Sequence, residues 1–213
     1  MVKQQRLLVA TFALLATLTI ILGASVVSAQ TRIYHFEREW VQIWINQDGT
    51  IDLSYHMRLT LDSGPNINFV QIGQPNGDYR IGEAVDQFGR ILATGDDSSS
   101  SDYKARVTFS DPLVAGQTLE FNLTTNVGRM LFEDTQNPGH VGMQFTPTWW
   151  EQAVVNDLRI LIILPEGVSQ EMVNTTDVFW TSAENVDGRL GIFWEKIIHR
   201  SFPGSIKKPG KTL

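Results

Sequence analysis

The chain has 213 residues, of which 42% are hydrophobic and 19% charged, with no cysteine and a formal net charge of -6. This composition excludes a disordered chain, a collagen-like chain and a small disulfide-bonded scaffold. Aromatic residues make up 10% of the chain and are accompanied by 17 glycines and 8 prolines, which favours strands and turns over a helical bundle.

Residues 1–29 have the pattern of an export signal. Lys3 and Arg6 precede an uncharged, mainly apolar run from Leu7 to Ala29. The run ends in small residues, which predicts cleavage between Ala29 and Gln30. Its apolar core is long, so an uncleaved anchor helix stays open as an alternative. Either outcome predicts an extracytoplasmic protein, secreted or held in the cell envelope.

Charge is distributed unevenly after this signal. Residues 30–195 carry ten basic and 23 acidic side chains, a net charge of -13, whereas residues 196–213 carry basic side chains and no acidic ones. A segment with this negative charge repels the phosphate backbone of nucleic acids, and nucleic acid is therefore excluded as a partner. We expect the basic tail, with its glycines and prolines, to be disordered.

The absence of cysteine excludes a lipid-modified cysteine, haem attachment through thiols and a thiolate metal site. Association with a membrane would therefore require the uncleaved N-terminal helix or a partner protein.

The mature chain begins with a β-hairpin pattern. Trp40–Ile45 is apolar, and Ile51–Asp62 alternates apolar and polar residues throughout, as a half-buried strand does. The connection Asn46–Thr50 contains Asp-Gly, which supplies the positive φ angles of a hairpin turn.

Further strand patterns follow at intervals, and no helix pattern appears after the signal. We therefore predict an all-β domain over residues 30–195, an antiparallel β-sandwich that is immunoglobulin-like or related. One sandwich or two remains open. The expected strands are 68–72, 79–85, 104–109, 118–124, 157–164 and 190–194, with an exposed loop at 94–102.

No catalytic motif is present. The four histidines lack metal-ligand spacing, and there is no His-Glu-x-x-His pattern or Gly-x-Ser-x-Gly elbow. We expect no cofactor, no metal and no enzymatic activity. An uncharacterised cell-envelope hydrolase is kept as an alternative, because two opposed carboxylates cannot be recognised from sequence.

Aromatic residues provide the candidate contact site. Phe145 is followed by the pair Trp149-Trp150, and neighbouring residues of an extended chain point to opposite sides, so one indole is expected near the surface. We predict that Phe145, Trp149 and Trp150 contact a glycan or a protein. The alternative places one ring in the core and the other over a sheet edge.

The hairpin Val41–Leu53, the strand end Leu164–Gly167 and the run Gly188–Glu195 together resemble an uncharacterised family of bacterial predicted membrane proteins. The resemblance implies an extracytoplasmic N-terminal β domain followed by transmembrane helices, and it supplies no catalytic residues. This chain departs from the pattern after Glu195, where it turns basic. We hypothesise that the chain is a truncated or frame-shifted relative of this family. If so, the DNA downstream of the gene should encode, in some reading frame, a continued strand pattern and a hydrophobic membrane segment.

These features predict a non-catalytic surface interaction or sensing module, whose partner is a protein or a cell-wall glycan. A glycan-binding module that uses exposed Trp149 and Trp150 is the alternative.

Overall fold

The computed structural model describes residues 31–135, 137–148, 150, 153–174 and 179–197. The expected signal with its junction Ala29/Gln30, Trp149 and residues 198–213 lie outside the described residues. Within the described ranges no helix is both long and apolar enough to cross a membrane.

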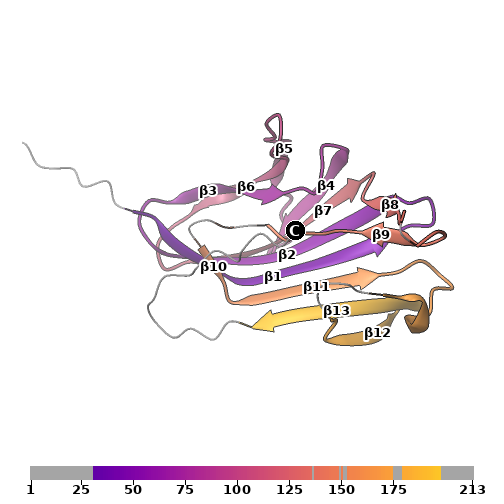
Figure 1. The fold of residues 1–213 in the computed structure, drawn as a ribbon. Helices are drawn as coiled ribbons and strands as arrows, with labels where there is room; N and C mark the ends of the chain where they lie inside the picture. The colour runs from indigo at the N-terminus through magenta and orange to yellow at the C-terminus, as the bar shows by residue number, and fades with distance from the viewer. Residues whose placement is uncertain (1–30, 136, 149, 151–152, 175–178, 198–213) are drawn as a thin grey trace, which may run out of the picture. The chain divides into compact units, whose positions relative to one another are not determined.

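The described chain folds into a large sheet, a small sheet and one separate hairpin (Figure 1). The eight-stranded sheet has the order β12-β13-β11-β1-β2-β7-β4, with β10 also pairing with β1, and the small sheet has the order β3-β6-β5. The large sheet contains β1 (Ile33–Ile45), β2 (Ile51–Ser63), β4 (Tyr79–Asp86), β7 (Thr118–Val127), β10 (Ala153–Val155), β11 (Asp157–Ile163), β12 (Ser182–Val186) and β13 (Arg189–Ile197). The small sheet contains β3 (Ile67–Gly73), β5 (Ala93–Asp96) and β6 (Lys104–Leu113), the hairpin contains β8 (Leu131–Glu133) and β9 (Val141–Met143), and a 3-10 turn covers Gln170–Met172.

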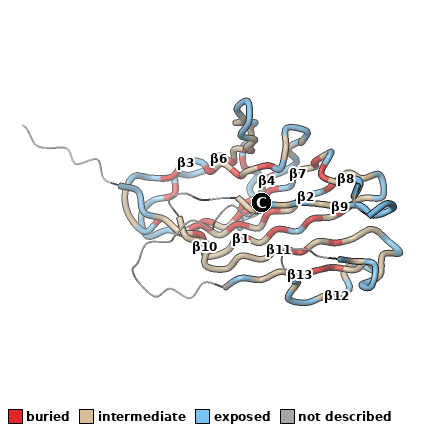
Figure 2. The backbone as a smooth tube through the Cα atoms, viewed as in Figure 1, coloured by how far each residue is buried: buried red, intermediate tan, exposed pale blue. Residues whose placement is uncertain are grey.

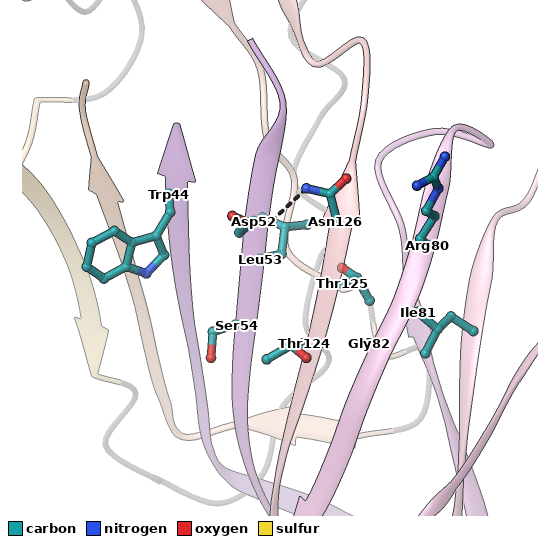
Figure 3. A pocket seen from close by; sticks show the side chains of 10 residues that line it. All are labelled: Trp44, Asp52, Leu53, Ser54, Arg80, Ile81, Gly82, Thr124, Thr125 and Asn126. Atoms are coloured by element: carbon teal, nitrogen blue, oxygen red, sulfur yellow. Dashed lines mark hydrogen bonds between the residues drawn. The ribbon is translucent and has the colours of Figure 1, made fainter. Parts of the chain in front are cut away.

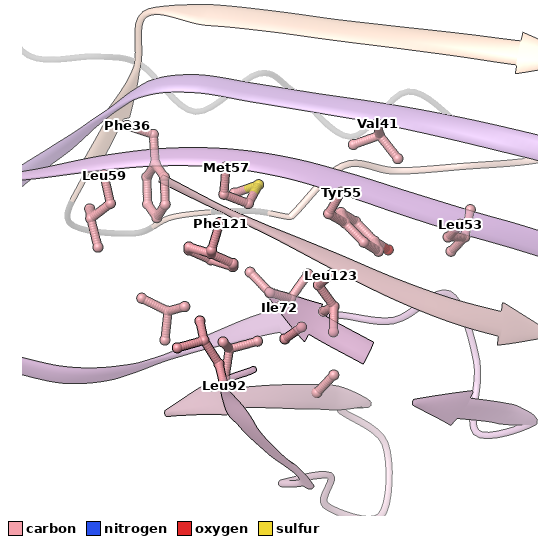
Figure 4. Packing of buried hydrophobic residues seen from close by; sticks show 14 of the residues in the cluster. Phe36, Val41, Leu53, Tyr55, Met57, Leu59, Ile72, Leu92, Phe121 and Leu123 are labelled. Atoms are coloured by element: carbon pink, nitrogen blue, oxygen red, sulfur yellow. The ribbon is translucent and has the colours of Figure 1, made fainter. Parts of the chain in front are cut away.

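The fold-class prediction is confirmed: the chain is an all-β sandwich of mostly antiparallel sheets. Alternation in β2 buries six side chains on one face, and buried positions recur along β1 and β2 (Figure 2). These side chains meet those of the small sheet in one hydrophobic cluster, so the two sheets share a core (Figure 4). The largest fully buried members of the cluster include Phe36, Tyr55 and Phe121 from the large sheet and Ile72 from the small one. Burial of each such side chain stabilises the fold by about 1.5–3 kcal/mol.

The predicted hairpin is also confirmed, because β1 pairs antiparallel with β2. The paired residues run from Ile33 opposite Ser63 to Ile45 opposite Ile51. Gly49 has a φ of +84° in the turn. The Asp48 carboxylate accepts hydrogen bonds from the backbone N–H of Thr50 at 3.0 Å and from its hydroxyl at 2.7 Å. Turn chemistry and strand alternation therefore act together to set which residues of β1 and β2 face the core.

The structure corrects three details. Residues 94–96 of the expected exposed loop belong to β5, whose polar residues occupy the edge of the small sheet and so lack an alternating pattern. Strands β10 and β11 run parallel to β1, although a purely antiparallel sandwich was expected. Apolar runs indicate burial but not strand direction, which depends on the path of the connecting chain. Strand β13 ends at Ile197, two residues beyond the expected end of the domain.

Candidate functional site

The described aromatic residues of the sequence-predicted site pack against the core. Phe145 is half-buried against the hydrophobic cluster. The ring centroid of Trp150 lies 4.1 Å from that of Phe36, and its indole N–H donates to Glu39 Oε2 at 2.9 Å. Trp149 lies outside the described residues. The structure thus shows Phe145 and Trp150 as packing residues of the segment that follows β9.

Glu39 fastens that segment to β1. Its side chain is buried, with an exposure of 0%, and it accepts hydrogen bonds from the Thr148 backbone N–H at 3.1 Å and from the Trp150 indole. Burial raises the pKa of Glu39 to about 7, although both hydrogen bonds act in the opposite direction. The carboxylate has a structural role and does not reach the surface.

The opposite, outward face of the large sheet carries a row of four side chains from four neighbouring strands. The register places Trp44 of β1 beside Asp52 of β2, Asp52 beside Asn126 of β7, and Asn126 beside Arg80 of β4. Neighbouring strands lie about 4.8 Å apart, so the row spans about 14 Å from Trp44 to Arg80. Paired residues of a sheet project from the same face, which brings residues from distant parts of the sequence together.

This row borders a depression of about 510 Å³ on the sheet surface, which we call the sheet-face depression (Figure 3). Its floor includes Ser54 of β2 and Thr124 of β7, which the register places side by side. Gly82 lies opposite, and a Cβ added there would stand 2.5 Å from the Thr124 hydroxyl. That hydroxyl accepts from the Glu83 backbone N–H at 3.0 Å and donates to the Glu83 carbonyl at 3.3 Å. The depression is therefore shaped by an irregularity of β4 at Gly82.

Asp52 provides a hydrogen-bond acceptor in the depression, and neighbouring side chains fix its orientation. Its two carboxylate oxygens accept hydrogen bonds from the amide of Asn126 at 2.6 Å and from the amide of Asn46 at 2.9 Å. A carboxylate offers about four lone-pair directions, so further donors can still be accepted. Trp44 lies at the opposite margin from Arg80. Its N–H donates to Gln42 at 3.4 Å, and its indole extends from β1 on the side away from Asp52 (Figure 3).

Arg80 differs from the other arginines. It is exposed, and among the described residues it is the only arginine without a hydrogen bond, an ion pair or an aromatic ring contact. Its guanidinium is therefore free to meet a ligand at the edge of the depression.

The adjoining half of the same face is internally paired. Trp40 lies between the guanidinium groups of Arg38 and Arg159, at 4.0 and 4.3 Å from its ring centroid. Glu120 accepts from His56 at 2.6 Å and pairs with Arg38 at 3.5 Å. The hydrogen bond from His56 is the main reason that the pKa of Glu120 is lowered. The charged groups in this half are paired with one another, in contrast to Arg80, although the buried indole N–H of Trp40 has no hydrogen-bond partner among the described residues.

Sequence reasoning missed the sheet-face depression. Alternation placed Asp52 and Ser54 on the polar face of their strand, but nothing in the sequence placed them beside Asn126 and Arg80. Among the described residues, no group of three His, Cys, Asp or Glu side chains is arranged to hold a metal ion.

Comparison with known proteins gives no family. No family model matches the chain and no curated protein matches it. Among solved structures, an M1 zinc metallopeptidase from Deinococcus radiodurans is similar with a TM-score of 0.48 and 11% identity, over 79% of this chain and 40% of that chain. A two-domain M1 zinc metallopeptidase mutant bound to L-arginine has a TM-score of 0.49 and 11% identity over the same shares. The chain thus spans 40% of the length of these structures, and neither its fold nor its function is derived from them.

Proposed function

We propose that the chain is a non-catalytic extracytoplasmic binding module, a surface interaction or sensing domain that contacts its ligand through the sheet-face depression. One observation carries the proposal: Trp44, Asp52, Asn126 and Arg80 form a continuous row across four strands, and the Arg80 guanidinium has no partner within the described part of the chain. Aromatic, acceptor and cationic groups within one shallow surface are the components of a binding site.

The shifted carboxylates support binding over catalysis. A general acid needs a raised pKa and contact with its substrate. Glu39 has the raised pKa, but it is fully buried. Glu120 lies on the outward face, but its pKa is lowered by its hydrogen bond to His56. Neither group combines the two requirements.

The sequence supports the proposed location and class of partner. The signal pattern of residues 1–29 favours a place outside the cytoplasm, and the charge of -13 over residues 30–195 disfavours nucleic acid. The resemblance to the extracytoplasmic domain of bacterial predicted membrane proteins agrees with both. The proposed partner is therefore a protein or a cell-wall glycan at the cell surface.

Sedimentation of the purified chain with the cell-envelope fraction of its own host tests this proposal. Ser54→Arg places a long cationic side chain on the floor of the depression, and the Ser54 side chain has no hydrogen-bond partner among the described residues. Ser110→Arg is the matched control, because Ser110 is an exposed residue of β6 in the small sheet. We expect the wild type and Ser110→Arg to sediment equally, and Ser54→Arg to bind at least tenfold more weakly. Equal binding of all three proteins would refute the proposal.

A further inference from the structure

We infer that the sheet-face depression binds a short oligosaccharide that carries a carboxylate group. This inference rests on the proposed function and adds the chemical class of the ligand. It is argued from the two ends of the row, from its floor and from the charge around it.

One end of the row offers an aromatic surface. Trp44 stands on β1 at the margin of the depression, with Asp52 and Asn126 between it and Arg80 (Figure 3). An indole provides a large, rigid, apolar face that packs against the C–H face of a sugar ring. The Arg189 guanidinium lies 5.4 Å from the Trp44 ring centroid, which restrains the orientation of the indole from within the fold.

The floor offers hydrogen-bond donors and acceptors close together. The Asp52 carboxylate is held in place by the amides of Asn46 and Asn126. The Ser54 hydroxyl can donate and accept, whereas the neighbouring Thr124 hydroxyl, which donates to the Glu83 carbonyl, can only accept. Sugar hydroxyls donate and accept at once, so they can pair with such a mixed surface. Fixed acceptors are also favourable because little side-chain freedom is lost on binding.

The far end of the row offers a cation. Arg80 is exposed and, within the described part of the chain, has no ionic partner. A guanidinium presents parallel N–H donors that match a carboxylate in two-point contact. The row spans about 14 Å by strand spacing, so a ligand that touches both Trp44 and Arg80 must extend beyond a single sugar ring.

The charge of the domain limits how anionic the ligand can be. Residues 30–195 carry a net charge of -13, and Asp52 lies in the same row as Arg80. A polyanion would be repelled by this field, whereas a single carboxylate can be accommodated by Arg80. The structure therefore points to an oligosaccharide with one acidic group rather than to a phosphate polymer.

The test uses an array of acidic oligosaccharides, each printed beside its neutral counterpart. Each acidic probe carries a single carboxylate: a trisaccharide with one terminal galacturonate is paired with galactotriose, and a muramic acid disaccharide with its carboxyl-reduced form. Arg80→Met removes the guanidinium charge and keeps a chain of similar length. Arg129→Met is its matched control, because Arg129 is 80% exposed, pairs with Asp78 and lies outside the depression.

We expect the wild type and Arg129→Met to bind at least one acidic probe at least tenfold more tightly than its neutral counterpart. Arg80→Met should bind the two members of that pair equally. Added salt should weaken wild-type binding to the acidic probe but not the binding of Arg80→Met, because the ion pair is exposed and screened. Trp44→Leu, once its folding is verified by thermal unfolding, should lose both members of the pair.

Three results would overturn the inference. These are binding to none of the array, equal binding of acidic and neutral partners by the wild type, or a preference for acid that survives Arg80→Met. The sedimentation experiment separates this failure from failure of the proposed function. If Ser54→Arg abolishes envelope binding while no array glycan binds, the depression remains a binding site for a ligand of another class.

Discussion

Replacing Glu39 by glutamine should change how the stability of the protein depends on pH. The pKa of Glu39 is raised from 4.5 to about 7 in the folded protein because the carboxyl group is buried. Between these two pH values the folded state keeps a proton that the unfolded state has released. The free energy of unfolding therefore falls as the pH rises from 4.5 to 7, and the loss is complete above the folded-state pKa.

The size of the effect follows from the same two pKa values. Each pKa unit corresponds to about 1.4 kcal/mol, so Glu39 should lower the free energy of unfolding by about 3 kcal/mol between pH 4 and pH 8. Glu39→Gln cannot titrate and should lack this contribution. The two donors, Thr148 and Trp150, contact different oxygens of Glu39, and glutamine replaces one of these oxygens by an NH2 group, so one donor loses its acceptor at a cost of about 1–3 kcal/mol, independent of pH.

Urea unfolding followed by tryptophan fluorescence at pH values from 4 to 8 measures both proteins. The stability difference, wild type minus Glu39→Gln, should fall by about 3 kcal/mol over this range. Subtracting the free energy of the variant cancels the pH dependence of all groups that both proteins share. One of these is Glu120, whose lowered pKa gives a contribution of opposite sign that is lost as the pH falls. Glu133→Gln, at an exposed position of β8, should leave the pH profile unchanged. Parallel profiles for the wild type and Glu39→Gln would refute the assigned pKa.

Three further substitutions probe the packing and the backbone, each measured by urea unfolding at constant pH. Leu123→Ala opens a cavity at a fully buried position of β7 and should cost about 2–5 kcal/mol; a loss below about 1 kcal/mol would show that the site collapses. Gly64→Ala should cost more than about 1 kcal/mol, because φ is +98° and the new Cβ would lie 2.6 Å from the Thr31 carbonyl oxygen; an unchanged midpoint would contradict that backbone conformation. Arg189→Met removes donors to the carbonyls of Leu164 at 2.6 Å, Ile163 at 3.2 Å and Ile45, and should cost about 2 kcal/mol; Arg189→Lys should restore part of the loss.

Local patterns in the sequence were sufficient for the central hairpin. The alternation of β2 and the Asp-Gly turn predicted which side chains of Ile51–Asp62 face the core, and all six apolar ones are buried. The apolar run at 157–164 predicted a strand, which is β11 in the structure and is covered on both faces. Leu161 and Ile163 are buried on one side, while Ile160 and Ile162 pack against the central core on the other. Such patterns are local, because each strand must bury an apolar face whatever its neighbours are.

The buried acid and the packed tryptophan could not be assigned in this way. One indole of the pair Trp149-Trp150 was expected near the surface, but the pattern does not reveal that the Trp150 N–H reaches Glu39, which is 111 residues earlier in the chain. Glu39 itself lies in an apolar-rich strand, and only the returning segment at Thr148–Trp150 explains how a carboxyl group can be buried there.

By itself the sequence determined the all-β class, the hairpin, the apolar face of β2 and the unequal distribution of charge. Tertiary structure alone decided that β11 runs parallel to β1 and that Trp44, Asp52, Asn126 and Arg80 share one row. The physical reason is the range of the interactions involved. Alternation and turn chemistry act between neighbours in the chain, whereas a site on a sheet face is built by hydrogen-bond register between strands that are distant in sequence.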